Sequence, residues 1–288
     1  MDRLRMAAEL VKLRISCFAT LSALAAFFST GHGTGARALA IGVFLLACGA
    51  CALNEYQERE SDALMERTKG RPIPSGRISP ASSALIGGSS LAAGLLILTV
   101  AGGRQAGLLG LAGVLWYNVV YTRLKRATPF AAVAGSLVGA APPAIGWVAA
   151  GAPLSDPRLL ALCFFFCLWQ VPHFWLLVPE YGPELERAGI RSLSGVMGQG
   201  GVRRLICVWM SVSASSCLLL PLFGSIGSVS ACVLLAAAAC WLTWKSARLL
   251  LIEGGAGAFR AAFADINAFA LLVMGLLAVD PYLGRAIY

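Results

Sequence analysis

Three oxygen-bearing side chains are spaced in a way that suits a metal ion: Asn54, Glu58 and Asp62 recur at every fourth residue. On a helix this spacing puts all three on one face. Two carboxylates stacked there repel each other unless a cation lies between them, and proteins hold Mg²⁺ with one or two carboxylates together with substrate phosphate oxygens. The alternative is a solvated helix end, because Arg59 and Glu60 also lie in this segment.

A basic segment follows these acids within a few residues. Its cations are Arg67, Lys69, Arg71 and Arg77, and proline and glycine residues punctuate it. Arginine binds phosphate through a planar fork, and lysine binds it as a point charge. An acidic face followed by such a loop indicates a site for a diphosphate. A loop on the positive inner side of a membrane would also explain the cations, but it would not explain the acidic face beside them.

The composition places these motifs in a membrane protein. Of the 288 residues, 58% are hydrophobic and 13% are charged, whereas a soluble domain has about 25% charged residues. This excludes a soluble globular protein and a disordered chain. The nine Cys residues all lie in apolar stretches, where Cys behaves as a small hydrophobic residue, so no disulfide framework is predicted. The net charge of +9 then indicates membrane orientation rather than nucleic-acid binding.

Nine segments are long and apolar enough to cross a bilayer, for which a helix needs about 20 residues. They cover roughly residues 13–30, 37–53, 82–102, 106–122, 130–151, 159–178, 204–223, 227–244 and 261–279. We therefore predict an all-α, polytopic membrane protein with nine transmembrane helices in one bundle. A single integral-membrane domain is expected over residues 1–288.

The distribution of Lys and Arg predicts how these spans are oriented. Nineteen of the 23 Lys and Arg residues fall in the tail and loops of one side, and the other side has only Arg37, Arg104, Arg158 and Arg285. Positive residues accumulate in cytoplasmic loops. The N-terminus is therefore expected inside and the C-terminus outside, in a bacterial plasma (inner) membrane. The acidic face and the basic loop would then face the cytoplasm.

The acidic segment, which reads Asn-x-x-x-Glu-x-x-x-Asp, and the following Met-x-Arg-Thr-x-x-Arg-Pro resemble the UbiA-type intramembrane prenyltransferases. Further segments resemble the heme-farnesylating branch of that family. They are Lys-Leu-Arg at 12–14, the Tyr-Thr-Arg-Leu-Lys to Gly-Trp stretch at 121–147, Trp-Gln-Val-Pro-His-Phe at 169–174 and Arg-Ala-Gly-Ile at 187–190. The resemblance covers roughly residues 12–195 well and the last three helices weakly.

This resemblance implies an enzyme that transfers a farnesyl group from farnesyl diphosphate to a vinyl group of heme b, giving heme O for terminal oxidase assembly, with Mg²⁺ as cofactor. It also implies the lipid bilayer as surroundings, heme-modifying or oxidase assembly proteins as candidate partners, and no nucleic acid.

Together with the spacing, the resemblance suggests roles for individual residues. The expected metal ligands are Asn54, Glu58, Asp62, Glu180 and Glu184. The expected diphosphate-binding residues are Arg67, Lys69, Arg71, Lys125 and Arg126. The expected catalytic residues are Asn54, Glu58, Asp62 and Lys125. The expected contacts to the heme acceptor are His173, Trp169, Gln170 and Phe174.

Two acidic positions depart from the family's pattern. Glu58 stands where the family usually has Asp, which keeps the charge on a longer arm. Glu184-Leu185 stands where the family usually has Asp-Tyr, and Glu180 lies one helical turn earlier. The pair Glu180 and Glu184 is therefore only a candidate for a second metal-binding group.

The residues leave other functions open. A related prenyltransferase could use a quinone precursor as its acceptor. An ion-coupled transporter could also use carboxylates in its spans, but transporters place these near the bilayer midplane. Here the acids cluster at the inner helix ends beside a polybasic loop, which favours a diphosphate. His173 could equally be a packed side chain that bonds a backbone carbonyl.

Overall fold

The structure, a computed structural model, describes residues 2–31, 33–187, 192–251 and 256–283. Every regular element within these residues is helical. The elements are α1 (Asp2–Leu10), α2 (Leu13–Ser29), α3 (Ala36–Ala63), α4 (Pro80–Leu115), the π-helix η1 (Trp116–Tyr121), α5 (Thr122–Ala127), α6 (Ala131–Gly135), α7 (Leu137–Ala149), α8 (Pro157–Trp175), α9 (Val178–Arg187), α10 (Leu193–Ser216), α11 (Leu219–Leu222), α12 (Val229–Leu251), α13 (Ala256–Val279) and the 3₁₀-helix η2 (Asp280–Tyr282).

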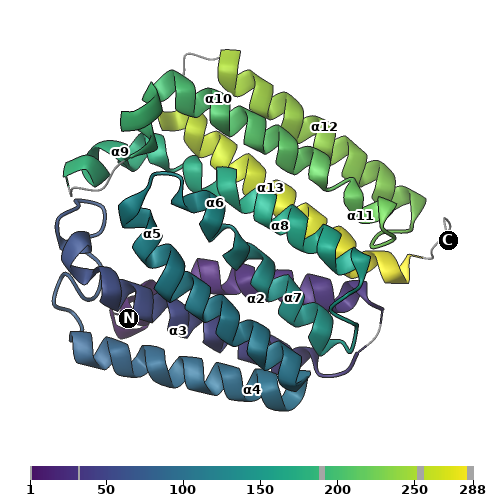
Figure 1. Cartoon of the computed structure of the whole chain (residues 1–288), viewed down its shortest axis with the longest axis horizontal. Coiled ribbons are helices and arrows are strands. Elements are labelled where there is room, and N and C mark those ends of the chain that lie inside the picture. Colours follow the sequence, from purple (N-terminus) through teal and green to yellow (C-terminus); the bar gives the residue numbers. More distant parts are fainter. Residues whose placement is uncertain (1, 32, 188–191, 252–255, 284–288) are drawn as a thin grey trace.

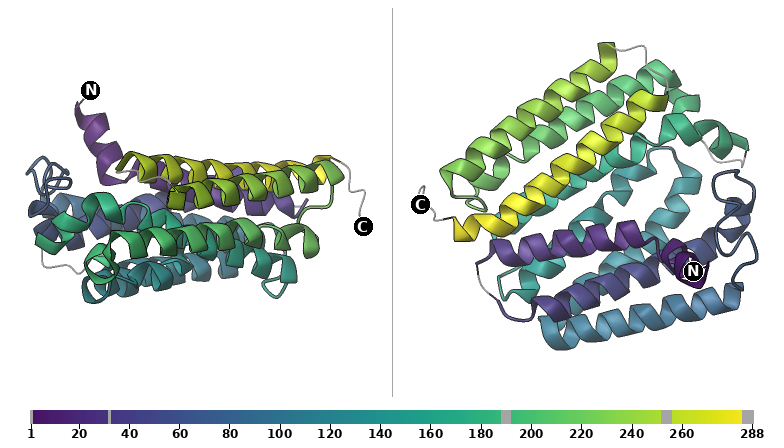
Figure 2. Two further views of the ribbon diagram at one scale, coloured as in Figure 1. Left: turned by 90° about the horizontal axis from the view of Figure 1, so that it is seen from above. Right: turned by 180° about the vertical axis from the view of Figure 1, so that it is seen from behind.

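The helices form one bundle in which α2 and α13, close to the two ends of the chain, are neighbours. α13 packs against α2, and α2 also packs against α3 and α7. The right-hand view of Figure 2 shows α2 and α13 side by side. Buried apolar side chains form two main clusters, one among α2, α3, α4 and α7 and one centred on α8, α10, α12 and α13. The predicted all-helical membrane fold is confirmed.

Within the residues that the structure describes, seven helical stretches are long and apolar enough to cross a membrane, or eight if the bent pair α1 and α2 counts as one span. One of them, Pro80–Ala127, is 48 residues long. Gly103 interrupts it with a φ of 86°. A Cβ on Gly107 would collide with the side chain of Thr99, although eight residues of straight helix would separate these positions by about 12 Å. The chain therefore folds back at Gly103, and Figure 1 shows the two arms side by side.

This reversal lies where the sequence predicts the boundary between its third and fourth spans. The difference between seven stretches and nine predicted spans comes from this reversal and from α2, which has only 17 residues. The count of nine and the inside–outside orientation stay predictions.

Side-chain caps fix where two of the long helices begin. The hydroxyl of Ser79 accepts a hydrogen bond from the N–H of Ser82 (3.1 Å), and Pro80 opens α4. The carboxylate of Asp156 accepts a hydrogen bond from the N–H of Arg158 (2.9 Å) at the start of α8, where a proline again occupies the first helical position. Capping side chains satisfy N–H groups that the first turn of a helix leaves unpaired, and proline suits the first helical position because it has no N–H.

Gly146 lets α7 approach α2 closely, because a Cβ at this position would overlap the carbonyl oxygen of Ala23. The Gly146→Ala substitution is expected to destabilise the protein by about 1–3 kcal/mol, the usual cost of overpacking. Thermal unfolding in detergent should show a lower midpoint. Gly275→Ala on α13 is the matched control, since a Cβ there meets nothing within 4 Å. Equal midpoints for the two variants would contradict the close α2–α7 contact.

Candidate active site

The acidic face predicted from the spacing lies in the C-terminal part of α3. Asn54, Glu58 and Asp62 are all buried, with exposed fractions of 1%, 4% and 2%. Helical periodicity explains this shared burial, since residues four apart lie one turn above another. Buried carboxylates need partners, because an ionised group without a counter-charge is costly to remove from water.

Each of these three side chains has a cationic partner from a different part of the chain. The Nζ of Lys12 donates to the Oδ1 of Asn54 (2.6 Å). Lys125, on α5, forms an ion pair with Glu58. The guanidinium of Arg71 donates to the Oδ2 of Asp62 (2.6 Å), with which it forms an ion pair. The partners therefore are Lys12, Lys125 and Arg71, and they line the acidic face along its length.

Lys12 reaches this site because of an unusual backbone conformation. It is the one residue other than glycine with a positive φ among the described residues, at 46°. The left-handed conformation ends α1 and begins α2 at an angle of 61°. Left-handed geometry is unfavourable for a residue with a Cβ, so the bend is held by its surroundings. The sequence indicated Lys12 only as part of a resembling segment, and the contact with Asn54 comes from the fold.

The basic loop between α3 and α4 is fastened to α3 by buried groups. The hydroxyl of Thr68 donates to the backbone oxygen of Asp62 (2.8 Å). The Oε1 of Glu55 accepts a hydrogen bond from the N–H of Ile73 (3.1 Å), and Glu55 is fully buried. These two bonds hold the loop on both sides of Arg71. Sequence analysis missed Glu55, because a carboxylate next to Asn54 lies off the four-residue repeat.

The same loop also meets α1 and α9. Arg77 forms an ion pair with Glu9 of α1 (2.7 Å). The backbone N–H of Arg67 donates to Glu184 of α9 (3.3 Å), and its guanidinium lies 4.4 Å from the ring centre of Tyr181. Burial lowers the pKa of the Arg67 side chain from its ordinary value, and the neighbouring Arg71 lowers it further. Figure 1 shows α9 and this loop at the same end of the bundle.

The predicted site residues outside α3 therefore differ in where their side chains lie. Glu184 joins the basic loop, whereas the side chain of Glu180 lies outside the described residues. Lys69 is exposed and forms an ion pair with Glu66 (2.5 Å), away from the acidic face. Arg126 is also exposed, and its guanidinium donates to the backbone oxygen of Gln57 (3.3 Å).

Aromatic rings connect this polar region to α8. η1 is a wide π-helical turn, a form that occurs often at functional sites. Its last residue, Tyr121, stacks on Tyr117 (5.9 Å) and on Phe174 of α8 (5.7 Å). The Nζ of Lys125 lies 5.9 Å from the Tyr121 ring centre. Aromatic faces attract cations, so this stack suits a positively charged carbon released beside Lys125.

The predicted acceptor residues follow along the same helix. The His173 ring lies 4.8 Å from the ring centres of both Trp169 and Phe263. Its Nδ1 is buried and has no hydrogen-bond partner in the described part of the chain, and the same is true of the Oε1 of Gln170. The indole N–H of Trp169 donates to the carbonyl of Ile266 (2.9 Å). Trp169 thus ties α8 to α13, while Gln170 and His173 each keep a buried polar atom without a partner among the described residues.

The side-chain oxygen atoms of the acidic face suit a divalent cation that is held partly by a substrate phosphate. Within the described part of the chain no three His, Cys, Asp or Glu residues converge as a complete protein cage would require. Mg²⁺ in phosphate-transferring sites needs only one or two carboxylates, because phosphate oxygens and water supply the rest. Asn54, Glu58 and Asp62 provide such oxygens, so the residues present fit this ion.

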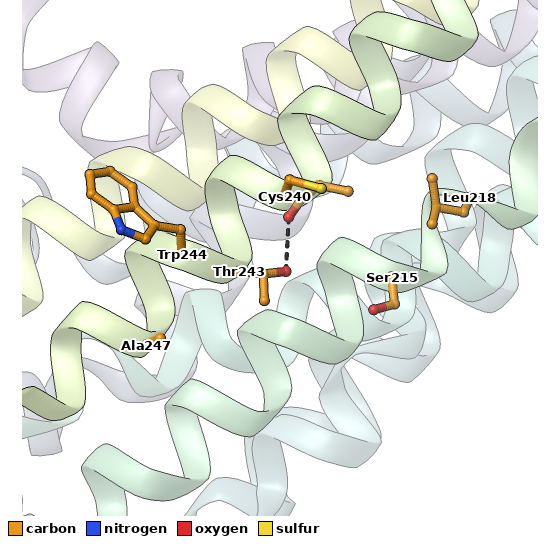
Figure 3. A pocket seen from close by; sticks show the side chains of 7 residues that line it. Ser215, Leu218, Cys240, Thr243, Trp244 and Ala247 are labelled. Atoms are coloured by element: carbon orange, nitrogen blue, oxygen red, sulfur yellow. Dashed lines mark hydrogen bonds between the residues drawn. The ribbon is translucent and has the colours of Figure 1, made fainter.

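A groove of about 430 Å³ lies elsewhere, between α10 and α12. Figure 3 shows its lining, including Ser215, Cys240 and Trp244. Thr243 in the same groove donates its hydroxyl to the carbonyl of Ala239 (2.8 Å). None of the lining residues is charged. A groove without charged side chains cannot neutralise a diphosphate, so it is not the site.

Comparisons with known proteins agree with this arrangement. The model of the UbiA prenyltransferase family matches residues 15–278. A protoheme IX farnesyltransferase of Geobacter sulfurreducens is 45% identical over 193 residues, which are 67% of this chain and 71% of the relative. A protoheme IX farnesyltransferase of Oleidesulfovibrio alaskensis is 34% identical over 279 residues and 96% of both chains.

Solved structures of UbiA homologs share the fold. The apo structure of a homolog from Aeropyrum pernix superposes with a TM-score of 0.77 at 18% identity, covering 92% of this chain and 97% of that chain. A homolog from Archaeoglobus fulgidus bound to GPP and Mg²⁺ gives a TM-score of 0.63 at 14% identity, covering 94% of this chain and 99% of that chain.

Proposed function

Because the chain belongs to the UbiA prenyltransferase family, we propose that it transfers the farnesyl group of farnesyl diphosphate to a vinyl group of protoheme IX (heme b), giving heme O. The names of its relatives support this acceptor over a quinone precursor. The observation that carries the proposal is the buried acidic face of α3, in which each of the three side chains contacts a Lys or Arg side chain. This is the charge pattern that a metal-bound diphosphate requires.

The first step would be release of diphosphate from the farnesyl carbon. Negative charge grows on the leaving group as the C–O bond breaks, and preorganised cations stabilise that charge. Lys12, Arg71 and Lys125 lie around the acidic face in positions to do this. A bound divalent cation, which we take to be Mg²⁺ as in the A. fulgidus homolog, would act as a Lewis acid on the phosphate oxygens. Asn54, Glu58 and Asp62 would hold it.

The second step would be capture of the allylic cation by the acceptor. Tyr121 and Phe174 offer stacked ring faces to the positive carbon. An electron-rich vinyl carbon would then form the new C–C bond, which leaves the positive charge on the other vinyl carbon. Water would add to that carbon and lose a proton, which gives the hydroxyl group of the product. Apolar walls of the bundle would keep water from quenching the cation before the acceptor does. His173 and Gln170, whose Nδ1 and Oε1 atoms are buried without partners among the described residues, would contact the porphyrin.

We place this site at the cytoplasmic face of the inner membrane, on the basis of the Lys and Arg distribution. In a background without native Cys, Ser75→Cys in the exposed loop before α4 should resist an impermeant thiol reagent applied outside intact cells. Ser155→Cys, exposed in the loop before α8, is the matched control and should react readily. The opposite pattern of labelling would overturn the orientation and the cytoplasmic access of the site.

The reaction itself is tested by expressing the chain in a host that lacks heme O and analysing extracted heme by mass spectrometry. A product with the mass of farnesylated, hydrated protoheme IX is expected. A prenylated quinone precursor with unchanged heme would refute the proposed acceptor. Farnesyl diphosphate, geranyl diphosphate and geranylgeranyl diphosphate supplied to membranes in competition should give mainly the farnesyl product.

A further inference from the structure

The groove between α10 and α12 lies on the outer surface of the bundle. Of the residues that line it, Ser215 and Leu218 on α10 and Cys240 and Trp244 on α12 are exposed. Figure 3 shows Leu218 and Trp244 toward opposite ends of the groove. Its volume of about 430 Å³ is within the range of ordinary ligand sites. Because its walls carry no charge, an apolar chain can lie along them.

An arginine stands at the Trp244 end of this groove. The guanidinium of Arg248, one turn further along α12, lies 5.0 Å from the centre of the Trp244 ring, a distance at which the ring face attracts the cation. Lys245 on the same helix forms an ion pair with Asp265 of α13 (3.1 Å). Arg248 is exposed, and no carboxylate among the described residues pairs with it. Its charge is therefore available to a group outside the chain.

A second arginine comes from α10 at the same end. Arg204 is exposed and lies eleven residues before Ser215, which is about three helical turns, so both are on one face of α10. The hydroxyls of Ser211 and Ser246 share a hydrogen bond (2.9 Å), which sets the register of the two antiparallel helices. Counted from this bond, the backbones of Arg204 and Arg248 differ by about 7.5 Å along the bundle. Two long arginine side chains can span this difference and meet at one phosphate.

The charge and position of this end select the kind of ligand. Neither α10 nor α12 contains an acidic residue. α12 has 23 residues, about the length that crosses a bilayer, so its last turn lies at a membrane surface. Basic pockets between transmembrane helices hold anionic lipid head groups, and arginine binds phosphate through its planar fork. A second copy of this chain, with a net charge of +9, would instead bring like charges together.

We propose that the α10–α12 groove binds an anionic phospholipid, with one acyl chain along the apolar walls and the phosphate between Arg204 and Arg248. Trp244 holds Arg248 at the boundary between the two parts. The two helices lack a carboxylate for a divalent cation, so the site suits a phosphodiester rather than a metal-bound diphosphate. The proposal does not depend on the proposed function, because none of the residues assigned to farnesyl transfer lies in the groove.

The head group is tested with the purified protein in a neutral detergent. Phosphatidylglycerol and phosphatidylcholine with the same acyl chains are titrated separately, and native mass spectrometry measures the bound fraction. We expect phosphatidylglycerol to bind about tenfold more tightly, and the variant Arg204→Gln with Arg248→Gln to lose this preference. Equal affinities for the two lipids in the unchanged protein would overturn the proposal.

The matched control removes the same charge elsewhere. Arg5→Gln with Arg37→Gln changes two exposed arginines on α1 and α3, helices that do not pack against α10 or α12 among the main contacts of the described residues. This control should keep the preference for phosphatidylglycerol. A loss as large as that of the groove variant would mean that net charge, and not this site, attracts the lipid, and the proposal would be wrong.

The acyl chain is tested separately from the head group. Ser215→Phe fills the groove, and because Ser215 is exposed the substitution leaves the core of the bundle unchanged. Phosphatidylglycerol affinity should fall in Ser215→Phe and stay at the wild-type value in Ser215→Ala. Soluble glycerol phosphate, which has the anion without the chain, should not displace the lipid. Unchanged affinity in Ser215→Phe, or displacement by glycerol phosphate, would show that the groove holds no chain.

Two other occupants give different results in the same assays. Displacement of phosphatidylglycerol by an equal concentration of farnesyl diphosphate would assign the groove to the prenyl substrate. A dimer that Ser215→Phe converts to a monomer, with phosphatidylglycerol affinity unchanged, would assign it to a second copy of the chain. Either result would overturn the phospholipid proposal.

Discussion

Asp62→Asn is expected to lower the turnover of farnesyl transfer at least about a hundredfold, the scale seen when one preorganised electrostatic contact to a developing charge is lost. The substitution keeps the shape of the side chain but removes a charge that is buried and paired with Arg71 at 2.6 Å. A divalent cation would lose one of its anionic ligands, and the diphosphate would lose part of the hold that this cation provides. Steady-state assays in membranes at saturating Mg²⁺ measure this loss.

The matched control for Asp62→Asn is Glu60→Gln. Glu60 lies on the same helix, but its side chain is 85% exposed and pairs only with its neighbour Arg59 among the contacts described. An exposed pair of this kind contributes little, so turnover should stay within about twofold of wild type. Activity of Asp62→Asn near that of wild type, with normal insertion into the membrane, would remove Asp62 from the site.

Lys125→Met is expected to have an effect of similar size on catalysis and a second effect on stability. Lys125 forms an ion pair with Glu58, whose side chain is 6% exposed. Removing the cation leaves a buried carboxylate unpaired, at a cost on the order of 3 kcal/mol. It also removes positive charge that the leaving diphosphate needs. Both turnover and the midpoint of thermal unfolding should fall.

The double variant Glu58→Gln with Lys125→Met separates these two effects. It removes both charges of the pair, and replacing a whole buried pair costs much less than breaking one. We expect the unfolding midpoint to return most of the way to that of wild type while farnesyl transfer stays low. Recovery of activity together with stability would show that Lys125 serves the fold and not the reaction.

Glu58 stands where the resemblance noted in the sequence leads one to expect aspartate. Glu58→Asp shortens the arm by one methylene. Glu58 and Lys125 come from helices α3 and α5 that pack through η1, so the distance between these backbones sets which length reaches both the lysine and a metal.

The class of protein and the location of its chemistry could both be predicted from the amino-acid sequence. A composition with 13% charged residues cannot cover a soluble surface, so burial in lipid follows directly. The four-residue repeat of Asn54, Glu58 and Asp62 is a property of one helix, and local periodicity is enough to put the three side chains on a common buried face. The basic loop follows this helix directly in the sequence. Its position beside the acidic face can therefore be predicted without knowing which distant segments pack together.

Tertiary structure alone decided which cation meets which acid. Lys12, Arg71 and Lys125 reach α3 from three segments, while Lys69 and Arg126, equally basic in the sequence, point to exposed partners. Positive residues gather in all cytoplasmic loops of a membrane protein. Their number in a loop therefore does not show which of them point toward the acidic face. That depends on how the helices pack and on the left-handed bend at Lys12.

The same reason explains the residues that sequence analysis missed. Glu55 holds the N–H of Ile73, and the ring of Phe263 lies against that of His173. Each of these contacts joins side chains whose spacing along the chain follows no period. Periodicity reports which face of a helix is buried, but only the packing of one helix against another reports what that face is buried against.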